Sequence, residues 1–353
     1  MVSDHTTANG KGGDFMKKRT GRRLLSTAVT AVMGVSVLAG CGTSTAAVTS
    51  STGASAAGTS AGTAASGSSA SAGTSSTDAS IAAVKDNGDG TYEVTVAVLD
   101  GMAPYTYTDE NGDMQGYDYE WMKAVDEKLS QYTFKYVSVG ADAAPAAIQA
   151  GTYAFSASAH FVTPAREEQF ILSIPESYYP VNLISRKEDS YTKFEDLNGK
   201  SLVPNPPNDG LSVVLNSMAA QYPDVKYTQD PTSEYIPYEE GMEDVVKGKY
   251  DCWFGGETMY NDIVKGNQEL ADATFCSKAI TTASCVAVIN KGLPQLREAI
   301  NEATCELYKD GTLQALSTKW LGADYFKTAQ DTDSIFDYAD YNADQADWYT
   351  QTK

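Results

Sequence analysis

Hydrophobic and polar positions alternate at two different periods in the first structured part of the chain. The segment 92–99 (YEVTVAVL) alternates apolar and polar residues and is rich in valine, which predicts a β-strand. Four apolar residues then share one face at helical spacing and predict a helix: Trp121, Met122, Val125 and Leu129. Two further strands and a short helix are predicted over 133–139, 155–161 and 143–150. This order is a β-α-β-α-β unit.

A similar unit follows later in the chain. Its predicted strands and helices cover 201–203, 211–222, 225–228, 242–247 and 250–254. Strand-like segments at 182–186 and 284–289 stand before and after it, and helices are predicted over 294–310 and 311–320. Because those last helices need a core and the second unit is already complete, we expect the chain to return to the first unit through 284–289. Two crossings between the units would form a hinge.

The first forty residues have the composition of an export signal. Lys17, Lys18 and Arg19 precede an apolar run over 24–38 that is too short to span a bilayer comfortably. The run ends at Leu38-Ala39-Gly40-Cys41, which predicts a lipoprotein cleavage site with Cys41 as the lipid-modified first residue. The alternative is an ordinary signal peptide with an unrelated cysteine. Residues 42–80 are almost all Gly, Ala, Ser and Thr, a composition typical of a flexible tether.

Charge and residue counts restrict the classes of function. The chain has a formal net charge of −20 and the segment 1–40 is basic, so nucleic acid is not an expected partner. His160 is the only histidine after residue 40, which argues against zinc enzymes and most histidine-dependent hydrolases. No metal or cofactor site is predicted. Four cysteines follow Cys41, and they are compatible with two disulfides or with buried free thiols: Cys252, Cys276, Cys285 and Cys305.

Short landmark segments recur in a familiar order from residue 92 to 322. They are Ala103-Pro104-Tyr105, Gly116-Tyr117-Asp118, Ala150-Gly151, Thr163-Pro164-Ala165-Arg166, Tyr178-Tyr179, Asp196-Leu197-Asn198-Gly199-Lys200, Lys247-Gly248-Lys249-Tyr250-Asp251 and Asp310-Gly311-Thr312-Leu313. In this order the chain resembles the amino-acid branch of the bacterial extracellular solute-binding proteins, which have the type II periplasmic-binding-protein fold.

The resemblance implies an α/β fold of two lobes joined by a two-strand hinge. We expect residues 81–186 and 284–326 to form the first lobe, 187–283 the second lobe and 327–353 an acidic, aromatic extension. Residues 1–40 and 41–80 would be the signal peptide and the lipidated tether. The implied function is capture of a small solute, such as an amino acid, for an ABC permease and without catalysis. The protein would be a monomer that its lipid anchors to the outer face of the membrane.

The resemblance also assigns candidate ligand contacts in the first lobe. Thr163 and Pro164 are typical of a helix N-cap and first position, so Arg166 would lie in a first turn, where the helix dipole disfavours a cation. In the family an arginine here binds the ligand α-carboxylate; pairing with Glu167 or Glu168 is the alternative. Four further residues are expected along the site, as an aromatic wall or at a strand edge: Tyr105, Ser158, Ala159 and Phe161.

In the second lobe two acids are candidates for the ligand ammonium. Asp209 is one, although it also suits a helix N-cap, and Glu257 is displaced by about one residue from the family's acidic position. The sequence departs from the family at Ala154, Ala159 and Phe161, where Asp, Gly and Thr are usual. Other functions compatible with this fold are a solute sensor or surface adhesin, or an enzyme of the dehydratase or lytic transglycosylase type.

Overall fold

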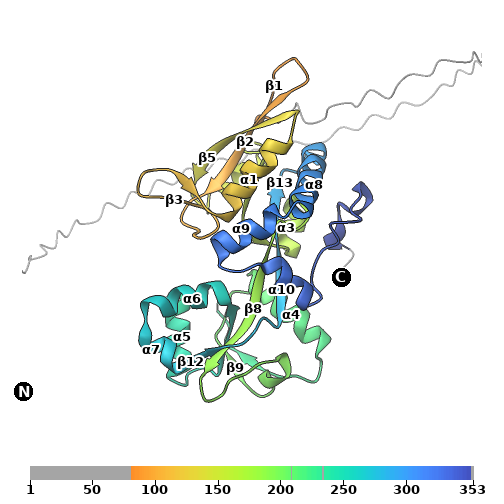
Figure 1. Ribbon diagram of the computed structural model, residues 1–353. Helices are drawn as coiled ribbons and strands as arrows, with labels where there is room; N and C mark the ends of the chain where they lie inside the picture. Colours follow the sequence, from red (N-terminus) through yellow and green to blue (C-terminus); the bar gives the residue numbers. More distant parts are fainter. Residues whose placement is uncertain (1–80, 208, 233, 351–353) are drawn as a thin grey trace, which may run out of the picture. The chain divides into compact units, whose positions relative to one another are not determined.

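The structure is a computed structural model that describes residues 81–350 apart from 208 and 233. The predicted signal peptide, Cys41 and the tether lie outside the described residues. The first lobe is built on β2 (Tyr92–Leu99), which pairs in parallel along its whole length with β5 (Tyr132–Val139). The other edge of β2 carries β1 (Val84–Asp86), antiparallel, and then β6 (Phe155–Phe161), parallel (Figure 1).

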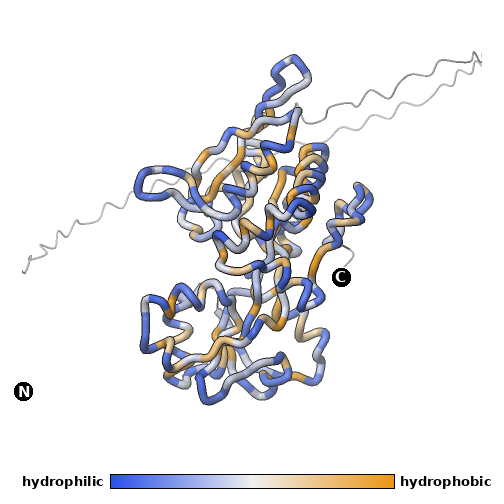
Figure 2. The backbone as a smooth tube through the Cα atoms, viewed as in Figure 1, coloured by the Kyte–Doolittle hydropathy of each residue, from blue (hydrophilic) through white to orange (hydrophobic). Residues whose placement is uncertain are grey.

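Helices bury the apolar faces of this sheet. Helix α1 (Tyr117–Lys128) places Trp121, Met122 and Val125 in the core, each fully buried, and packs against α8 (Pro294–Lys309) and α9 (Thr312–Leu321). The short helix α2 (Ala144–Gln149) covers β2 and β6 through its buried Ile148. Figure 2 shows that the turns at the tips of this lobe are hydrophilic, whereas hydrophobic segments run through its interior.

The second lobe has a smaller sheet. Strand β9 (Ser201–Leu202) pairs in parallel with β10 (Thr228–Gln229) and with β11 (Cys252–Gly256). Four helices surround it: α4 (Gly210–Gln221), α5 (Tyr238–Val246), α6 (Glu257–Gly266) and α7 (Gln268–Ala273). Trp253 is buried among Met242, Val245 and Leu270, so its role is core packing.

Two long antiparallel strands, β8 (Ser177–Arg186) and β13 (Thr281–Ile289), belong to both lobes. The end of β13 pairs with β6 in the first lobe, and the end of β8 pairs with β11 in the second. Residue Val181 lies at the changeover, because it faces Thr281 on one side and Gly256 on the other. The expected return of the chain through 284–289 is therefore confirmed, and the fold has two lobes joined by two strands.

The remaining elements are short. They are the hairpin β3 (Tyr107–Thr108) and β4 (Met114–Gln115), α3 (Pro164–Gln169), β7 (Ile171–Leu172), β12 (Thr274–Cys276), α10 (Tyr325–Asp331) and three 3-10 turns at Phe194–Leu197, Ala343–Gln345 and Trp348–Thr350. Of the helices in the described residues, none is long and apolar enough to span a bilayer. The four cysteines after Cys41 are free thiols, which settles the choice that the sequence left open.

The C-terminal extension packs on the first lobe. Tyr338 is buried, stacks on Tyr308 of α8 with ring centroids 4.1 Å apart, and donates a hydrogen bond to the carbonyl of Pro175 (2.8 Å). The hydroxyl of Tyr178 in β8 accepts a hydrogen bond from the backbone N–H of Phe336 (2.8 Å). The extension is thus attached to the hinge strand as well as to the lobe.

A glycine controls how α1 meets the loop after β2. Gly116 precedes α1 with a φ of 116°, and a Cβ at this position would lie 2.2 Å from the backbone oxygen of Tyr105. Gly112, in the β3–β4 turn, also has a positive φ (87°) but has no atom within 4 Å of such a Cβ. Alanine at Gly112 would therefore introduce backbone strain alone, whereas alanine at Gly116 would introduce strain and a steric clash.

We expect Gly116→Ala to lower the free energy of unfolding by more than about 3 kcal/mol, because strain and a backbone clash add. Gly112→Ala should cost only about 1–2 kcal/mol, which is the cost of the left-handed conformation alone. Urea unfolding of both variants measures the difference. Equal losses would show that the contact with Tyr105 is not a constraint.

Candidate functional site

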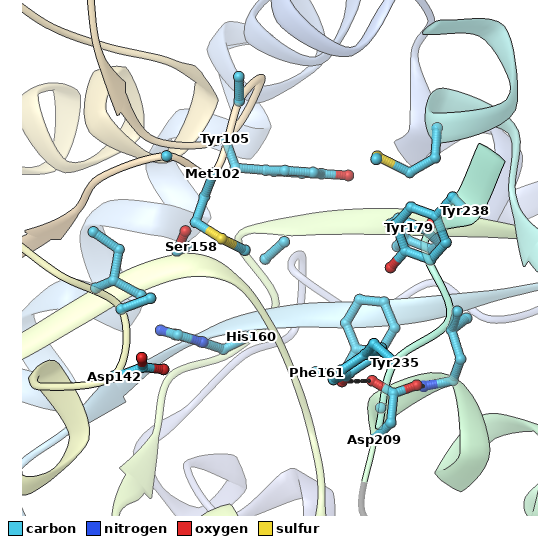
Figure 3. A pocket seen from close by; sticks show the side chains of 18 of the residues that line it. Met102, Tyr105, Asp142, Ser158, His160, Phe161, Tyr179, Asp209, Tyr235 and Tyr238 are labelled. Atoms are coloured by element: carbon cyan, nitrogen blue, oxygen red, sulfur yellow. Dashed lines mark hydrogen bonds between the residues drawn. The ribbon is translucent and has the colours of Figure 1, made fainter. Parts of the chain in front are cut away.

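A cavity of about 680 Å³ lies where the carboxyl ends of β2, β5 and β6 face the second lobe. In open α/β sheets this edge is the usual place for a ligand. The first lobe contributes the loops after β2 and β5, the end of β6 and Arg166. The second lobe contributes the start of α4, the segment 235–237 with Tyr238 at the start of α5, and Met259 of α6, and the hinge contributes Tyr179. Figure 3 shows the aromatic side chains from both lobes around this space.

Arg166 lies in the first turn of α3 and lines the cavity. Thr163 is the N-cap, as predicted, since its hydroxyl accepts a hydrogen bond from the Arg166 N–H (3.3 Å). The guanidinium Nη1 donates to the carbonyl of Phe161 (2.7 Å), and no carboxylate of the described chain forms an ion pair with it. Burial lowers the pKa of Arg166, and the charge of Asp209 partly offsets this effect. A desolvated, unpaired cation favours an anionic group of a ligand.

Three other first-lobe candidates also line the cavity. Tyr105 is 5% exposed, and its hydroxyl has no hydrogen-bond partner in the described chain. The Ser158 hydroxyl is already bonded to Thr106 (2.7 Å). The Phe161 ring packs on the Tyr179 ring with centroids 5.1 Å apart, and a Cβ on Gly210 would lie only 2.3 Å from the Phe161 ring. Phe161 therefore makes a contact between the lobes that only glycine permits.

Ala159 has a positive φ (48°), and a buried acid holds it there. Its N–H donates to Asp118 Oδ2 (3.0 Å), and Asp118 is fully buried beside the equally buried Glu176. No Lys or Arg of the described chain forms an ion pair with either carboxyl. Burial raises the pKa of Asp118 to about 7, and burial together with the Asp118 charge raises that of Glu176. The pair therefore retains a proton where isolated carboxyl groups would be ionised.

Asp209 lines the cavity from the second lobe. It is the N-cap of α4, since Oδ2 accepts from the Leu211 N–H (3.0 Å), and Oδ1 accepts from the Tyr235 hydroxyl (2.6 Å). The capping role that the sequence suggested is thus present, and it leaves the carboxylate facing the cavity (Figure 3).

Glu257, the other acid expected in the second lobe, does not line the cavity. It is the first residue of α6, and its N–H donates to Asn182 Oδ1 (3.0 Å). Burial raises the pKa values of Cys276 and Tyr325, and the negative charge of Glu257 raises them further. The structure thus brings together six of the seven candidate contacts and leaves Glu257 apart.

Several lining residues were not predicted as ligand contacts from the sequence. They come from loops, the hinge and the start of α5, and they are Met102, Asp142, Tyr179, Tyr235 and Tyr238. His160 also lines the cavity; it is bonded to Ser156 (3.1 Å), and burial and then Arg166 lower its pKa to about 3, so it is neutral at pH 7. In the described residues no group of three His, Cys, Asp or Glu is arranged to hold a metal.

Comparison with known families matches residues 94–323 to the bacterial extracellular solute-binding proteins, family 3. The chain belongs to this family. The matched range begins in β2 and ends just after α9, so it contains the second lobe, most of the first lobe and every residue that lines the cavity. Members of this family bind solutes outside the cell, and the resemblance seen in the landmark segments is confirmed.

Curated relatives share about a quarter of their residues with this chain. The L-cystine-binding protein TcyJ of Bacillus subtilis is 29% identical over 233 residues, which cover 63% of this chain and 81% of TcyJ. The ABC transporter arginine-binding protein 1 of Escherichia coli is 26% identical over 223 residues, covering 62% and 86%.

Solved structures agree on the fold. The probable amino-acid ABC transporter extracellular-binding protein ytmK of Bacillus subtilis has a TM-score of 0.55 at 22% identity, covering 67% of this chain and all of that one. The L-cystine solute receptor of Neisseria gonorrhoeae, solved in an unliganded open conformation, has a TM-score of 0.50 at 22% identity, covering 66% and 93%. Both support the two-lobed α/β architecture.

The carboxyl pair predicts a pH dependence of stability. Because the folded pKa of Asp118 is raised, the folded chain keeps a proton that the unfolded chain releases above about pH 4. The pair's contribution to stability is therefore present below pH 4 and is lost as the pH rises through about 7. Asn at position 118 can still accept from Ala159 and carries no charge.

We expect the stability of Asp118→Asn relative to the parent to increase from pH 5 to pH 7, by at most about 1.4 kcal/mol per pH unit. Urea unfolding at several pH values measures it. Glu110→Gln, which neutralises an exposed acid outside the cavity, is the control. A difference that stays constant with pH would contradict the shared proton.

Proposed function

We propose that this protein captures an amino acid between its lobes and delivers it to an ABC permease. The observation that carries the proposal is Arg166, a cation that lines the cavity of a solute-binding protein without an ion pair to any described residue. Arg166 binds the ligand α-carboxylate with two parallel hydrogen bonds, and Asp209 binds the ammonium from the opposite lobe. A zwitterion therefore joins the lobes.

The lobe that moves comprises residues 187–283, and the rest of the described chain, including the C-terminal extension, forms the other body. Only a ligand that touches both bodies favours their closure, because its differential affinity sets the equilibrium. Tyr105 and Phe161 form the apolar wall over which the ligand side chain lies. The ligands named for the relatives, L-cystine and arginine, are both amino acids with this zwitterionic head.

The same proposal places the protein on the outer face of the membrane. Cys41 carries the lipid, and residues 42–80 are the tether that holds the binding domain clear of the surface. The sequence basis is the basic segment, the apolar run and the small residues directly before Cys41.

Arg166→Ala should weaken amino-acid binding by roughly thirty-fold to several thousand-fold, because removing one partner of a desolvated charge pair costs about 2 to 5 kcal/mol. Arg166→Lys should fall between, since lysine keeps the charge but loses the two-pronged geometry. The measurement is calorimetry with the amino acid, L-cystine included, that gives the largest thermal shift. Lys135→Ala, an exposed cation on β5 outside the cavity, is the control. Parental affinity in Arg166→Ala would refute the carboxylate clamp.

Cys41→Ser should move the protein from the membrane fraction to the medium or the soluble envelope fraction. Lipid attachment requires the cysteine thiol, and serine offers no equivalent. Fractionation followed by immunoblotting of the tagged chain measures this redistribution. Membrane retention equal to that of the parent would count against a lipid anchor at Cys41.

A further inference from the structure

The charged groups of the cavity lie at two separate ends. Figure 3 shows Asp142 and Asp209 at opposite ends of the pocket, with Phe161 beside Asp209 and the Met102 side chain nearer the middle. Arg166 belongs to the Asp209 end. Its guanidinium donates to the carbonyl of Phe161, and the charge of Asp209 is the main influence that opposes the lowering of its pKa by burial. One end therefore has a cation and an anion, and the other has an anion.

Asp142 has no structural role in the described chain that would explain its position at the cavity. It follows β5 in the loop before α2, and the N-cap of α2 is Ala143, with no side-chain cap. Asp142 is exposed and makes no hydrogen bond or ion pair in the described chain. Its neighbour in the pocket, His160, is neutral at pH 7 because its pKa is lowered, so it does not compensate the carboxylate.

The balance of charge distinguishes between ligands. Arg166 and Asp209 complement a zwitterionic head, which has no net charge. A ligand with only that head leaves Asp142 facing an apolar side chain as the lobes close and exclude water, which costs free energy. A ligand with a cation at its far end compensates Asp142, and the aromatic and thioether side chains that line the pocket accommodate an apolar spacer.

We infer that Asp142 binds a second, distal cationic group, so that the ligand is an amino acid with an amine or guanidinium at its far end. This inference rests on the proposed function, because Arg166 and Asp209 must hold the head. The distal cation belongs either to a side chain, as in arginine and lysine, or to a second amino-acid head, as in L-cystine.

The test uses ligand pairs that differ in the distal charge. Arginine and citrulline, and lysine and norleucine, have nearly the same shape, and L-cystine supplies the second source of the cation. Calorimetry is done with the parent and with Asp142→Asn. We expect the parent to prefer the cationic member of at least one pair or to bind L-cystine. Asp142→Asn should weaken that ligand about ten-fold or more and change citrulline and norleucine by less than about two-fold.

Glu110→Gln removes the same charge outside the cavity and should change no affinity, which separates a local contact from the field of the whole protein. The ligand-free melting temperature of Asp142→Asn should equal that of the parent, because the side chain is exposed. Loss of L-cystine but not arginine binding in Asp142→Asn assigns the cation to a second head; the reverse assigns it to a side chain.

Unchanged affinity of Asp142→Asn for the ligands that the parent binds, with binding abolished in Arg166→Ala, would overturn this inference and leave the proposed function standing. A parent that binds citrulline and norleucine as tightly as arginine and lysine, and does not bind L-cystine, would also overturn it. A parent that binds no amino acid would overturn both.

Discussion

The antiparallel ladder of β8 and β13 is the constraint on which the rest of the structure depends. The two strands pair with each other through their first halves, and the second half of each pairs with a different lobe, so the two sheets are joined in a fixed register. Slipping one of the two strands by one residue would turn each of its side chains to the opposite face of the sheet. The ladder therefore fixes the position of β6 against β11, and with it the two walls of the cavity.

A proline, Pro180, lies within the ladder at the point where β8 passes from one lobe to the other. Proline has no N–H and is unsuited to a central strand, yet Pro180 lies within β8 opposite Thr282. Here β8 pairs on one side only, since its pairing with β11 begins at Val181. The Tyr338 and Phe336 contacts of the C-terminal extension reach the same end of β8, at Pro175 and Tyr178. The extension thus steadies the first-lobe end of a strand that has few ladder bonds there.

The sequence predicts the regular parts of the fold well. The strands expected over 92–99 and 155–161 have those bounds in the structure, because valine-rich or small-residue runs end at clear turns. The hinge strand was predicted to begin at 182 but begins at Ser177, since the proline and the tyrosines mask its pattern. Helices α6 and α7 were not predicted, although α6 has an apolar face; α7 has only six residues, which is too short to show a helical period.

The candidate site was predictable where one local motif fixes a residue. Arg166 follows its N-cap and Asp209 is itself a cap, so both positions are determined by a few neighbours. Asp142 and Tyr235 lie on loops and Tyr238 begins α5, and only the fold brings these two distant parts of the sequence to one cavity. Glu257 fails to reach the cavity because α6 begins at that residue, and its charge acts on Cys276 and Tyr325 instead.

Two glycines explain why Asp209 is the second-lobe acid that faces the cavity. A Cβ on Gly256, the N-cap of α6, would lie 2.1 Å from the Tyr179 ring, and one on Gly210 would lie 2.3 Å from Phe161. The rings of Phe161 and Tyr179 thus occupy the space that side chains at the starts of α4 and α6 would need. An acid at position 256 would have to displace Tyr179, so the charge opposite Arg166 comes from the residue directly before Gly210. The absence of a Cβ at Gly210 and Gly256 therefore determines both the packing of the aromatic rings between the lobes and the position of the acid.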